Sequence, residues 1–340
     1  MLNCSYRLIA PRTIQPVLLQ VDAADRVVVR PTNLSICNAD QRYYQGVRNE
    51  EVLRKKLPMA LIHEGIGRVV SDQTGEHTCG DLVVMIPNEP SKQDLVIAEN
   101  YLSDSKFRGS GFDGFMQELV VLSPDRVIPL PRGIDADIAA FTELVSVAMH
   151  AIRRFMLTAH CRRRRVGIWG DGNVGYIVAL LLHYLLPDTE LFVVGRNSQK
   201  LADFTFVSDI FLASEMPVKA RVDHAFECCG GEGSASAIEQ IIEHIEPEGT
   251  VSLLGVVENS VPINTRMVLE KGLRFVGNSR SGRVDFVQVV ELYRKHPDIL
   301  DYLSSLIGHV HAVSNLQDIQ TAFEVDMRKP MGKTIMQWNM

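Results

Sequence analysis

Short apolar runs separated by turn residues characterise the first part of the chain, residues 1–147. Examples are the stretches at 26–30, 68–71, 81–86 and 118–122, which are rich in valine and leucine and are separated by segments containing Pro, Gly and Asp. Strands of this length with turn residues between them are typical of antiparallel sheets. The pattern therefore predicts a mostly antiparallel sheet or barrel.

The pattern changes over residues 165–280, where apolar runs of strand length alternate with runs of helical spacing. This alternation is typical of a parallel sheet with helices on both faces. The predicted fold class is therefore α/β, with a doubly wound parallel sheet in this region. We expect strands at 166–169, 191–194, 222–228 and 250–254, and helices at 174–186, 234–245 and 284–294.

Length and composition indicate an ordinary protein of about two domains. The chain has 340 residues, of which 46% are hydrophobic and 22% charged, with a net charge of −6. This balance gives no global basic field for nucleic acid, and no apolar run reaches the roughly 18–20 residues of a membrane span. No secretory signal is visible, so a cytoplasmic location is expected. The six cysteines are scattered and do not suggest a disulfide scaffold.

A glycine-rich turn joins the first expected strand of the parallel sheet to its helix. Gly170, Gly172 and Gly175 fit the pattern G-x-G-x-x-G, with Asn173 and Val174 between the last two. In this context the first glycine permits a tight turn, the second lets a pyrophosphate approach the backbone, and the third lets the helix pack close to the strand. The N–H groups at the helix start then face the anion, which predicts a dinucleotide site.

The end of the second strand distinguishes between the two nicotinamide dinucleotides. An NAD site usually has an Asp or Glu there, which binds the ribose 2′-hydroxyl. Here Gly195 is followed by Arg196, with Lys200 close behind. A guanidinium can bind a 2′-phosphate, so NADP(H) is favoured, with Arg196 as the first candidate and Lys200 as the second. A plain surface role for Arg196 is the alternative.

Four residues far apart in the sequence form a competent set of zinc ligands: Cys37, His63, Glu64 and Glu143. Three protein ligands and an exchangeable position make a catalytic zinc site. Spacing by itself, however, favours structural roles for such scattered residues.

The surrounding motifs resemble those of the zinc-dependent medium-chain alcohol and polyol dehydrogenases, over essentially the whole chain. Cys37-x-x-Asp40 is similar to the first ligand motif of that family, and His63-Glu64-Gly65-x-Gly67 to its zinc signature. Further similar segments are found at 80–84, 114–120, 129–131 and 143–151.

This resemblance implies the domain organisation and the roles of the site residues. It implies a mostly β, GroES-like catalytic domain at 1–147, an NADP-binding Rossmann domain at 148–284 and a segment at 285–340 that returns to the catalytic domain. It also implies that Cys37, His63 and Glu64 bind a catalytic zinc ion, that Glu143 binds it directly or through water, and that Asp40 orients the ligands.

Within the family, the stretches at 35–44, 56–65, 111–117, 169–175 and 264–272 most resemble the ribulose-5-phosphate reductases. That branch reduces D-ribulose 5-phosphate to D-ribitol 5-phosphate with NADPH. The product supplies CDP-ribitol for poly(ribitol phosphate) polymers such as teichoic acid, a part of cell wall biogenesis. The resemblance implies the same activity here.

Three departures from the family pattern matter. Residues 88–111 contain no cysteine, so the Cys₄ structural zinc of many relatives is not expected, and one catalytic zinc is predicted. Ala39 stands where many relatives have a Ser or Thr that relays the alcohol proton. Ile62 replaces the glycine that usually precedes the His-Glu pair.

The expected partners are small molecules and a second copy of the chain. The substrate is a sugar phosphate, and neither nucleic acid nor a membrane is expected. Residues 273–278 resemble the strand through which related homodimers pair, and association with a cytidylyltransferase is a pathway inference. Candidate cations for the substrate phosphate, each expected at the surface unless it has this role, are Arg42, Lys106, Arg108 and Arg280.

Three alternatives stay open. The chain could be another zinc dehydrogenase, similar to the sorbitol or threonine enzymes, or a zinc-free reductase of the same superfamily. A nucleotide-binding sensor that kept the fold and lost catalysis is the third, since fold alone does not establish function.

Overall fold

The computed structural model describes residues 1–329 and 331–340. In this part of the chain the contacts form two compact units, Met1–Ser146 with Ser281–Met340, and Val147–Arg280. The domain boundaries expected from the sequence, after residues 147 and 284, stay predictions.

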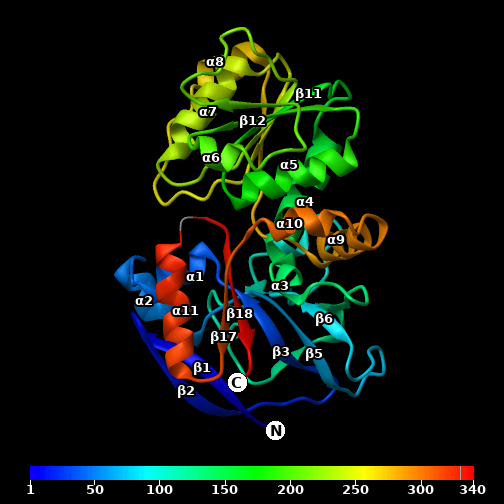
Figure 1. The fold of residues 1–340 in the computed structure, drawn as a ribbon, viewed down its shortest axis with the longest axis vertical. Coiled ribbons are helices and arrows are strands. Elements are labelled where there is room, and N and C mark those ends of the chain that lie inside the picture. Colours follow the sequence, from blue (N-terminus) through cyan, green and yellow to red (C-terminus); the bar gives the residue numbers. More distant parts are fainter. Residues whose placement is uncertain (330) are drawn as a thin grey trace. The chain divides into compact units, whose positions relative to one another are not determined.

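The first unit is built mainly of strands (Figure 1). Its strands are β1 (Leu2–Ala10), β2 (Thr13–Gln20), β3 (Val27–Ser35), β4 (Met59–Ala60), β5 (Glu64–Asp72), β6 (Leu82–Met85), β7 (Asn88–Glu89), β8 (Lys106–Phe107), β9 (Val120–Leu122), β10 (Val127–Pro129), β17 (Ile307–Val313) and β18 (Lys333–Trp338). Its helices are α1 (Asn38–Tyr44), α2 (Glu50–Lys56), η1 (Glu99–Tyr101), η2 (Pro124–Arg126), α3 (Ala136–Ala139), α9 (Arg283–Lys295), α10 (Ile299–Ser304) and α11 (Leu316–Arg328).

The predicted antiparallel sheet is confirmed in this unit. Its 7-stranded sheet has the order β10-β6-β5-β3-β18-β17, and β9 pairs with β3 beside this path. The pairs are antiparallel except for β17 with β18. Two smaller sheets have the orders β2-β1-β4 and β7-β8. Strand β3 is buried along most of its length, and other strands pair with it on both edges.

Helix α11 covers part of this sheet and closes the core. Its apolar side chains Ile319, Ala322 and Phe323 are fully buried in the same cluster as Val27 and Leu34 of β3. They recur at helical spacing, which places them on one face of the helix. The last strand, β18, is thereby held beside β3, next to the start of β5.

Buried arginines hold the cysteine-free segment 88–111 in place. Arg126 donates to Glu99 Oε1 at 2.8 Å and to the Asn88 carbonyl at 3.1 Å. Arg108 donates through Nε to Glu89 Oε1 at 2.7 Å. Both guanidiniums are buried, and a buried charge must be paired. One ion pair within the segment and one between the segment and η2 therefore fix its path.

The second unit has the predicted α/β fold. Its elements are α4 (Thr142–Thr158, which begins in the first unit), β11 (Arg165–Trp169), α5 (Asn173–Leu185), β12 (Glu190–Gly195), α6 (Ser198–Leu201), β13 (Asp209–Leu212), β14 (His224–Glu227), α7 (Gly233–His244), β15 (Thr250–Leu253), α8 (Thr265–Lys271) and β16 (Arg274–Gly277).

The six strands of this unit are all parallel, in the order β13-β12-β11-β14-β15-β16. The first strand, β11, is central, and the chain reverses direction across the sheet between β13 and β14. A doubly wound sheet binds its ligand beyond the carboxyl ends of the strands at this reversal. The glycine turn at 170–175 follows β11 directly and therefore lies at that position.

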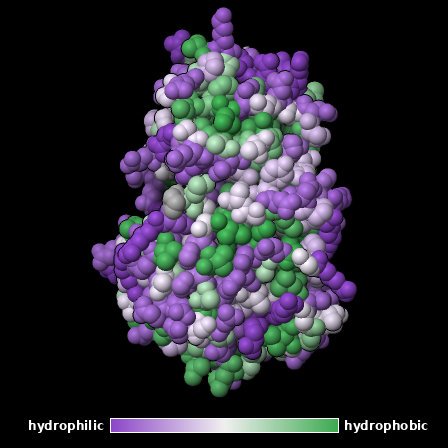
Figure 2. Space-filling model, in the orientation of Figure 1, coloured by the Kyte–Doolittle hydropathy of each residue, from purple (hydrophilic) through white to green (hydrophobic). Residues whose placement is uncertain are grey.

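No helix in the described residues is long and apolar enough to cross a bilayer. The face seen in Figure 2 mixes hydrophilic and hydrophobic residues, and the apolar ones form separate patches.

Candidate active site

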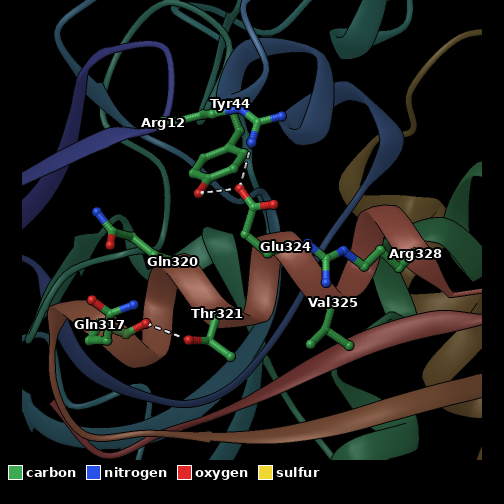
Figure 3. A pocket seen from close by; sticks show the side chains of 8 residues that line it. All are labelled: Arg12, Tyr44, Gln317, Gln320, Thr321, Glu324, Val325 and Arg328. Atoms are coloured by element: carbon green, nitrogen blue, oxygen red, sulfur yellow. Dashed lines mark hydrogen bonds and ion pairs between the residues drawn. The ribbon is translucent and has the colours of Figure 1, made fainter.

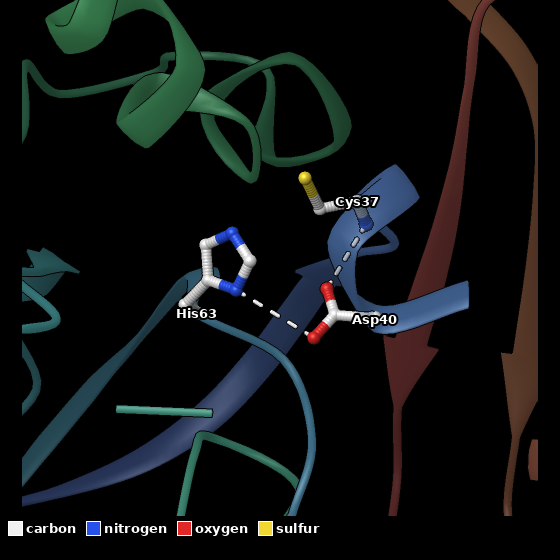
Figure 4. Close-up of side chains that lie close together, drawn as sticks. All are labelled: Cys37, Asp40 and His63. Atoms are coloured by element: carbon white, nitrogen blue, oxygen red, sulfur yellow. Dashed lines mark hydrogen bonds and ion pairs between the residues drawn. The ribbon is translucent and has the colours of Figure 1, made fainter. Parts of the chain in front are cut away.

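The start of helix α1 brings Cys37 and Asp40 beside His63. Cys37 is the N-cap of this helix, and its backbone N–H donates to Asp40 Oδ2 at 3.1 Å. Asp40 Oδ1 lies 3.5 Å from His63 Nδ1. Figure 4 shows the other ring nitrogen of His63 on the side toward the Cys37 sulfur. The ligand atoms of these three residues lie within 4.8 Å of one another.

The backbone at Ile62 fixes the position of His63. Ile62 has a φ of +72°, in the left-handed region that β-branched residues rarely adopt. Its N–H donates to Asp40 Oδ1 at 3.0 Å, and its carbonyl accepts from the Phe115 N–H at 2.7 Å. Strain of this kind, held by surrounding hydrogen bonds, is common at functional sites. It also explains why the family pattern has glycine at this position.

Negative charge surrounds the imidazole. Burial acts to lower the pKa of His63, but the nearby Asp40 and Cys37 outweigh it and hold that pKa well above its usual value. The cluster therefore favours positive charge beside Cys37 and Asp40.

Glu64 opens strand β5 and is held by two partners. Its Oε1 accepts from Lys333 Nζ at 2.8 Å, and its Oε2 accepts from Ser35 Oγ at 2.8 Å. All three side chains are buried. Burial acts to lower the pKa of Lys333, but Glu64 and Cys37 raise it above its usual value. The ammonium thus stays charged and fixes one oxygen of Glu64.

Glu143 enters the cluster from the first turn of α4. Its carboxylate oxygen lies in a second group with ligand atoms of His63 and Glu64, again within 4.8 Å of one another. Burial raises the pKa of Glu143 to about 7; His63 and Lys333 oppose this shift, and the negative Glu64 and Asp40 add to it.

The other four predicted site residues therefore lie around His63, in two groups that share it. The described part of the chain contains no single group that unites Cys37 with Glu143. A thiolate, an imidazole and carboxylates are the ligands that zinc takes in proteins. A cation would also offset the buried negative charge, so these residues fit a zinc ion. Their assignment as ligands stays a prediction.

The three glycines of the fingerprint have distinct steric environments in the second unit. Gly170 has a φ of +135°, and a Cβ there would lie 2.8 Å from the Cys228 carbonyl. A Cβ on Gly175 would lie 2.0 Å from the Gly170 oxygen. A Cβ on Gly172 would meet nothing within 4 Å, because it would project into open space. The turn therefore needs Gly170 and Gly175, and it leaves Gly172 open to a ligand.

A cavity of about 560 Å³ lies at this turn, and its lining includes Gly172, Gly195, Arg196 and Lys200. Arg196 and Lys200 are its two cationic residues, and in the described chain neither has a carboxylate within 4 Å. Asn173 and Val174 open helix α5 beside it. Four of the eight predicted cofactor residues thus line one cavity, and the other four belong to the same turn and helix start. Their contact with a cofactor stays a prediction.

Asp171, which sequence reasoning did not single out, positions the turn after β12. Its Oδ2 accepts from the backbone N–H groups of Arg196 at 2.7 Å and Asn197 at 2.8 Å. A Cβ on Gly195 would lie 2.6 Å from the Asp171 Cβ. Gly195 therefore allows Asp171 to approach and fix the backbone from which the Arg196 side chain extends.

Sequence reasoning also missed Lys333 and Ser35, because nothing local marks them. Lys333 lies 269 residues from its partner Glu64.

The expectation of a surface position for Arg108 is wrong, because this side chain is buried and binds Glu89 and the Val121 carbonyl. The guanidinium of Arg108 is therefore occupied by contacts within the protein.

A second cavity, of about 340 Å³, lies on helix α11 in the first unit (Figure 3). Glu324 accepts there from Arg12 at 2.9 Å and from the Tyr44 hydroxyl at 3.3 Å. The lining has no cysteine or histidine and one carboxylate, which these partners already hold. The candidate metal ligands around His63 are therefore the better candidate for the active site.

Comparisons with known proteins agree with the motifs. The model of the alcohol dehydrogenase GroES-like domain matches residues 23–132. The chain is 53% identical over 339 residues to ribulose-5-phosphate reductase 2 of Staphylococcus aureus, with 99% of each chain covered. It is 50% identical to the ribulose-5-phosphate reductase of Bacillus spizizenii, again with 99% of each covered. The crystal structure of S. aureus TarJ in complex with NADPH matches with a TM-score of 0.90 and 47% identity, covering 100% of both chains. The resemblance inferred from the motifs is confirmed.

The raised pKa of Glu143 predicts a pH dependence of stability in metal-free protein. The folded state keeps this proton up to about pH 7, whereas the unfolded chain releases it near 4.5. Because the folded state binds the extra proton between these values, stability falls as pH rises through this window, by up to about 3 kcal/mol. Urea titrations of chelator-treated protein at several pH values measure this fall.

Glu143→Gln should remove this part of the pH dependence, whereas Glu76→Gln, at an exposed glutamate, should keep it. An unchanged pH dependence in Glu143→Gln would contradict the assignment.

Proposed function

We propose that the chain, which belongs to the zinc-type medium-chain alcohol dehydrogenase family, is an NADP(H)-dependent ribulose-5-phosphate reductase. The reaction moves a hydride from NADPH to C2 of D-ribulose 5-phosphate and a proton to the C2 oxygen. The products are D-ribitol 5-phosphate and NADP⁺. The observation that carries the proposal is the gathering of Cys37, Glu64 and Glu143, from three parts of the sequence, around the buried His63 in two groups that share this histidine.

The cluster residues would hold one catalytic zinc ion. Cys37 supplies a thiolate, His63 an imidazole nitrogen, and Glu64 and Glu143 carboxylate oxygens. When bound, such an ion supplies Lewis acidity that polarises a substrate carbonyl. No structural zinc is proposed, because segment 88–111 offers no thiolate.

The other residues of the cluster hold the ligands in position. Asp40 contacts the backbone of Cys37 and faces the ring of His63, so it fixes both. Lys333 and Ser35 hold Glu64. Partners of this kind set the orientation and basicity of metal ligands.

The second unit binds and orients the dinucleotide. The N–H groups at the start of α5 would hold the pyrophosphate, and Gly172 would leave room for it, since a Cβ there meets nothing within 4 Å. Arg196 and Lys200 bind the 2′-phosphate, which is the feature that separates NADPH from NADH. The nicotinamide supplies the hydride chemistry, and the protein supplies position and charge.

Several finer expectations stay proposals. Strand β16 lies at the edge of the parallel sheet. An edge strand offers backbone groups for pairing, which supports a homodimer. We also propose a cytoplasmic location, a role in making CDP-ribitol for teichoic acid, and association with a cytidylyltransferase, all on the family resemblance.

A direct absorbance assay of NADPH consumption tests the proposal. Purified protein mixed with D-ribulose 5-phosphate should consume NADPH rapidly and NADH at least about 10-fold less efficiently, because a charged contact contributes more than 1 kcal/mol. Treatment with a chelator should abolish turnover, and added zinc should restore it.

Sorbitol and threonine with NADP⁺ are the comparison substrates. Faster oxidation of either would favour another zinc dehydrogenase, and full activity in zinc-free protein would favour a zinc-free reductase. Tight NADPH binding with no turnover would favour a sensor.

Replacement of Arg196 tests the cofactor assignment separately. Arg196→Gln should raise KM for NADPH by about 10–100-fold and leave KM for NADH nearly unchanged, since only NADPH carries the 2′-phosphate. Steady-state kinetics with both cofactors measure the difference. Arg266→Gln, at an exposed arginine on α8, is the matched control. Equal effects on both cofactors in Arg196→Gln would refute the assignment.

A further inference from the structure

Two cations lie against the ring of Tyr43 in the first unit. The guanidinium carbon of Arg48 lies 4.8 Å from the ring centroid, and Lys56 Nζ lies 5.8 Å from it. Tyr43 is the penultimate residue of α1, Arg48 lies in the loop after this helix, and Lys56 ends α2. The buried ring of Tyr43 thus brings together two positive charges from neighbouring elements.

These charges are not neutralised by the protein. In residues 1–329 and 331–340, neither Arg48 nor Lys56 has a carboxylate within 4 Å. The Nε of Arg48 is buried and has no hydrogen-bond partner. Lys56 Nζ donates to the carbonyl and the hydroxyl of Ser110, at 2.9 and 3.1 Å. Both contacts are neutral and leave its charge uncompensated.

A third cation, Arg42, is close enough to Arg48 to interact with its charge. Partial burial lowers the pKa of Arg42, and the positive charge of Arg48 lowers it further. Like charges gathered on one partly buried surface favour the binding of an anion there.

Helix α1 connects the cations around Tyr43, Arg48 and Lys56, to the candidate metal ligands around His63. Tyr43 follows Cys37 by six positions, which corresponds to about 9 Å along a helix axis. A second connection runs through the segment that carries Ser110. The ring of Phe107 lies 5.3 Å from that of His63, and a Cβ on Gly109 would lie 3.3 Å from the backbone of Ile62.

We infer that Arg48 and Lys56, held against Tyr43, form the subsite for the phosphate monoester of the substrate. The inference rests on the proposed function, which makes the substrate a ketose phosphate. Five covalent bonds separate the reacting C2 from the phosphorus of D-ribulose 5-phosphate, or about 6 Å in extended form. A carbonyl at the metal cluster would therefore place its phosphate near Tyr43.

The residue types suit this ligand. A phosphate monoester carries nearly two negative charges at neutral pH. Arginine offers a planar fork of donors that matches phosphate oxygens, and lysine adds a compact charge. The subsite would select phosphorylated ketoses over free ones of the same carbon skeleton.

Variants at the two cations test the subsite by kinetics. Arg48→Gln and Lys56→Gln should each lower kcat/KM for D-ribulose 5-phosphate by about 10-fold or more, mainly through KM. They should leave unchanged kcat/KM for free D-ribulose and KM for NADPH. Arg54→Gln, on the exposed face of α2, is the matched control and should behave as wild type. Lys56→Arg should recover most of the loss.

A binding measurement is independent of turnover. With NADPH saturating, inorganic phosphate should stabilise the wild-type protein and Arg54→Gln in thermal melts, and the phosphate concentration needed for a given stabilisation should be at least about 10-fold higher for Arg48→Gln and Lys56→Gln.

Together, the kinetic and binding measurements distinguish a failure of the phosphate subsite from a failure of the proposed function. Phosphate binding that depends on Arg48 and Lys56, without reduction of D-ribulose 5-phosphate, would retain the subsite and refute the substrate. Reduction of D-ribulose 5-phosphate with unchanged KM in both variants would retain the function and overturn the subsite. Equal losses with phosphorylated and free ketose would also overturn it.

Discussion

The site is organised by the burial of several negative groups around one imidazole. Asp40, Glu64 and Glu143 are all buried beside His63, and Lys333 pairs with Glu64. Charge out of water must be paired or neutralised. In the metal-free chain this is met in part by a proton retained on Glu143, whose pKa rises to about 7. A divalent cation meets the same requirement and leaves every ligand in its charged form. The cluster is therefore built for a cation.

The second unit satisfies a different constraint, which is steric. Gly170 and Gly175 lie where a Cβ would meet backbone, whereas a Cβ on Gly172 would project into the open cavity. Asp171 uses one carboxylate oxygen, Oδ2, to fix the backbone N–H groups of Arg196 and Asn197. This acidic group next to the cavity therefore positions the residue that is proposed to bind the 2′-phosphate.

Sequence reasoning succeeded where the signal is local and failed where it is not. The fingerprint that includes Gly172 and the alternation of strands and helices are contained in short windows, so the parallel sheet was predictable. The bond from Lys333 to Glu64 depends on β18 lying beside β3, and no local pattern reports that. The buried position of Arg108 was missed for the same reason. The metal cluster was found through family motifs, since spacing could not show that Cys37 and Glu143 approach one histidine.

The zinc content of the purified chain, measured by mass spectrometry together with protein concentration, shows directly whether these residues hold a metal ion. We expect one zinc ion per chain in the wild type and in Cys79→Ser, whose cysteine is exposed and belongs to neither group of candidate ligands. We expect strong loss in Cys37→Ser and in His63→Gln, with both variants folded and able to bind NADPH. A wild-type protein that reduces its substrate with no bound metal, or a Cys37→Ser variant with full zinc content and activity, would contradict the account.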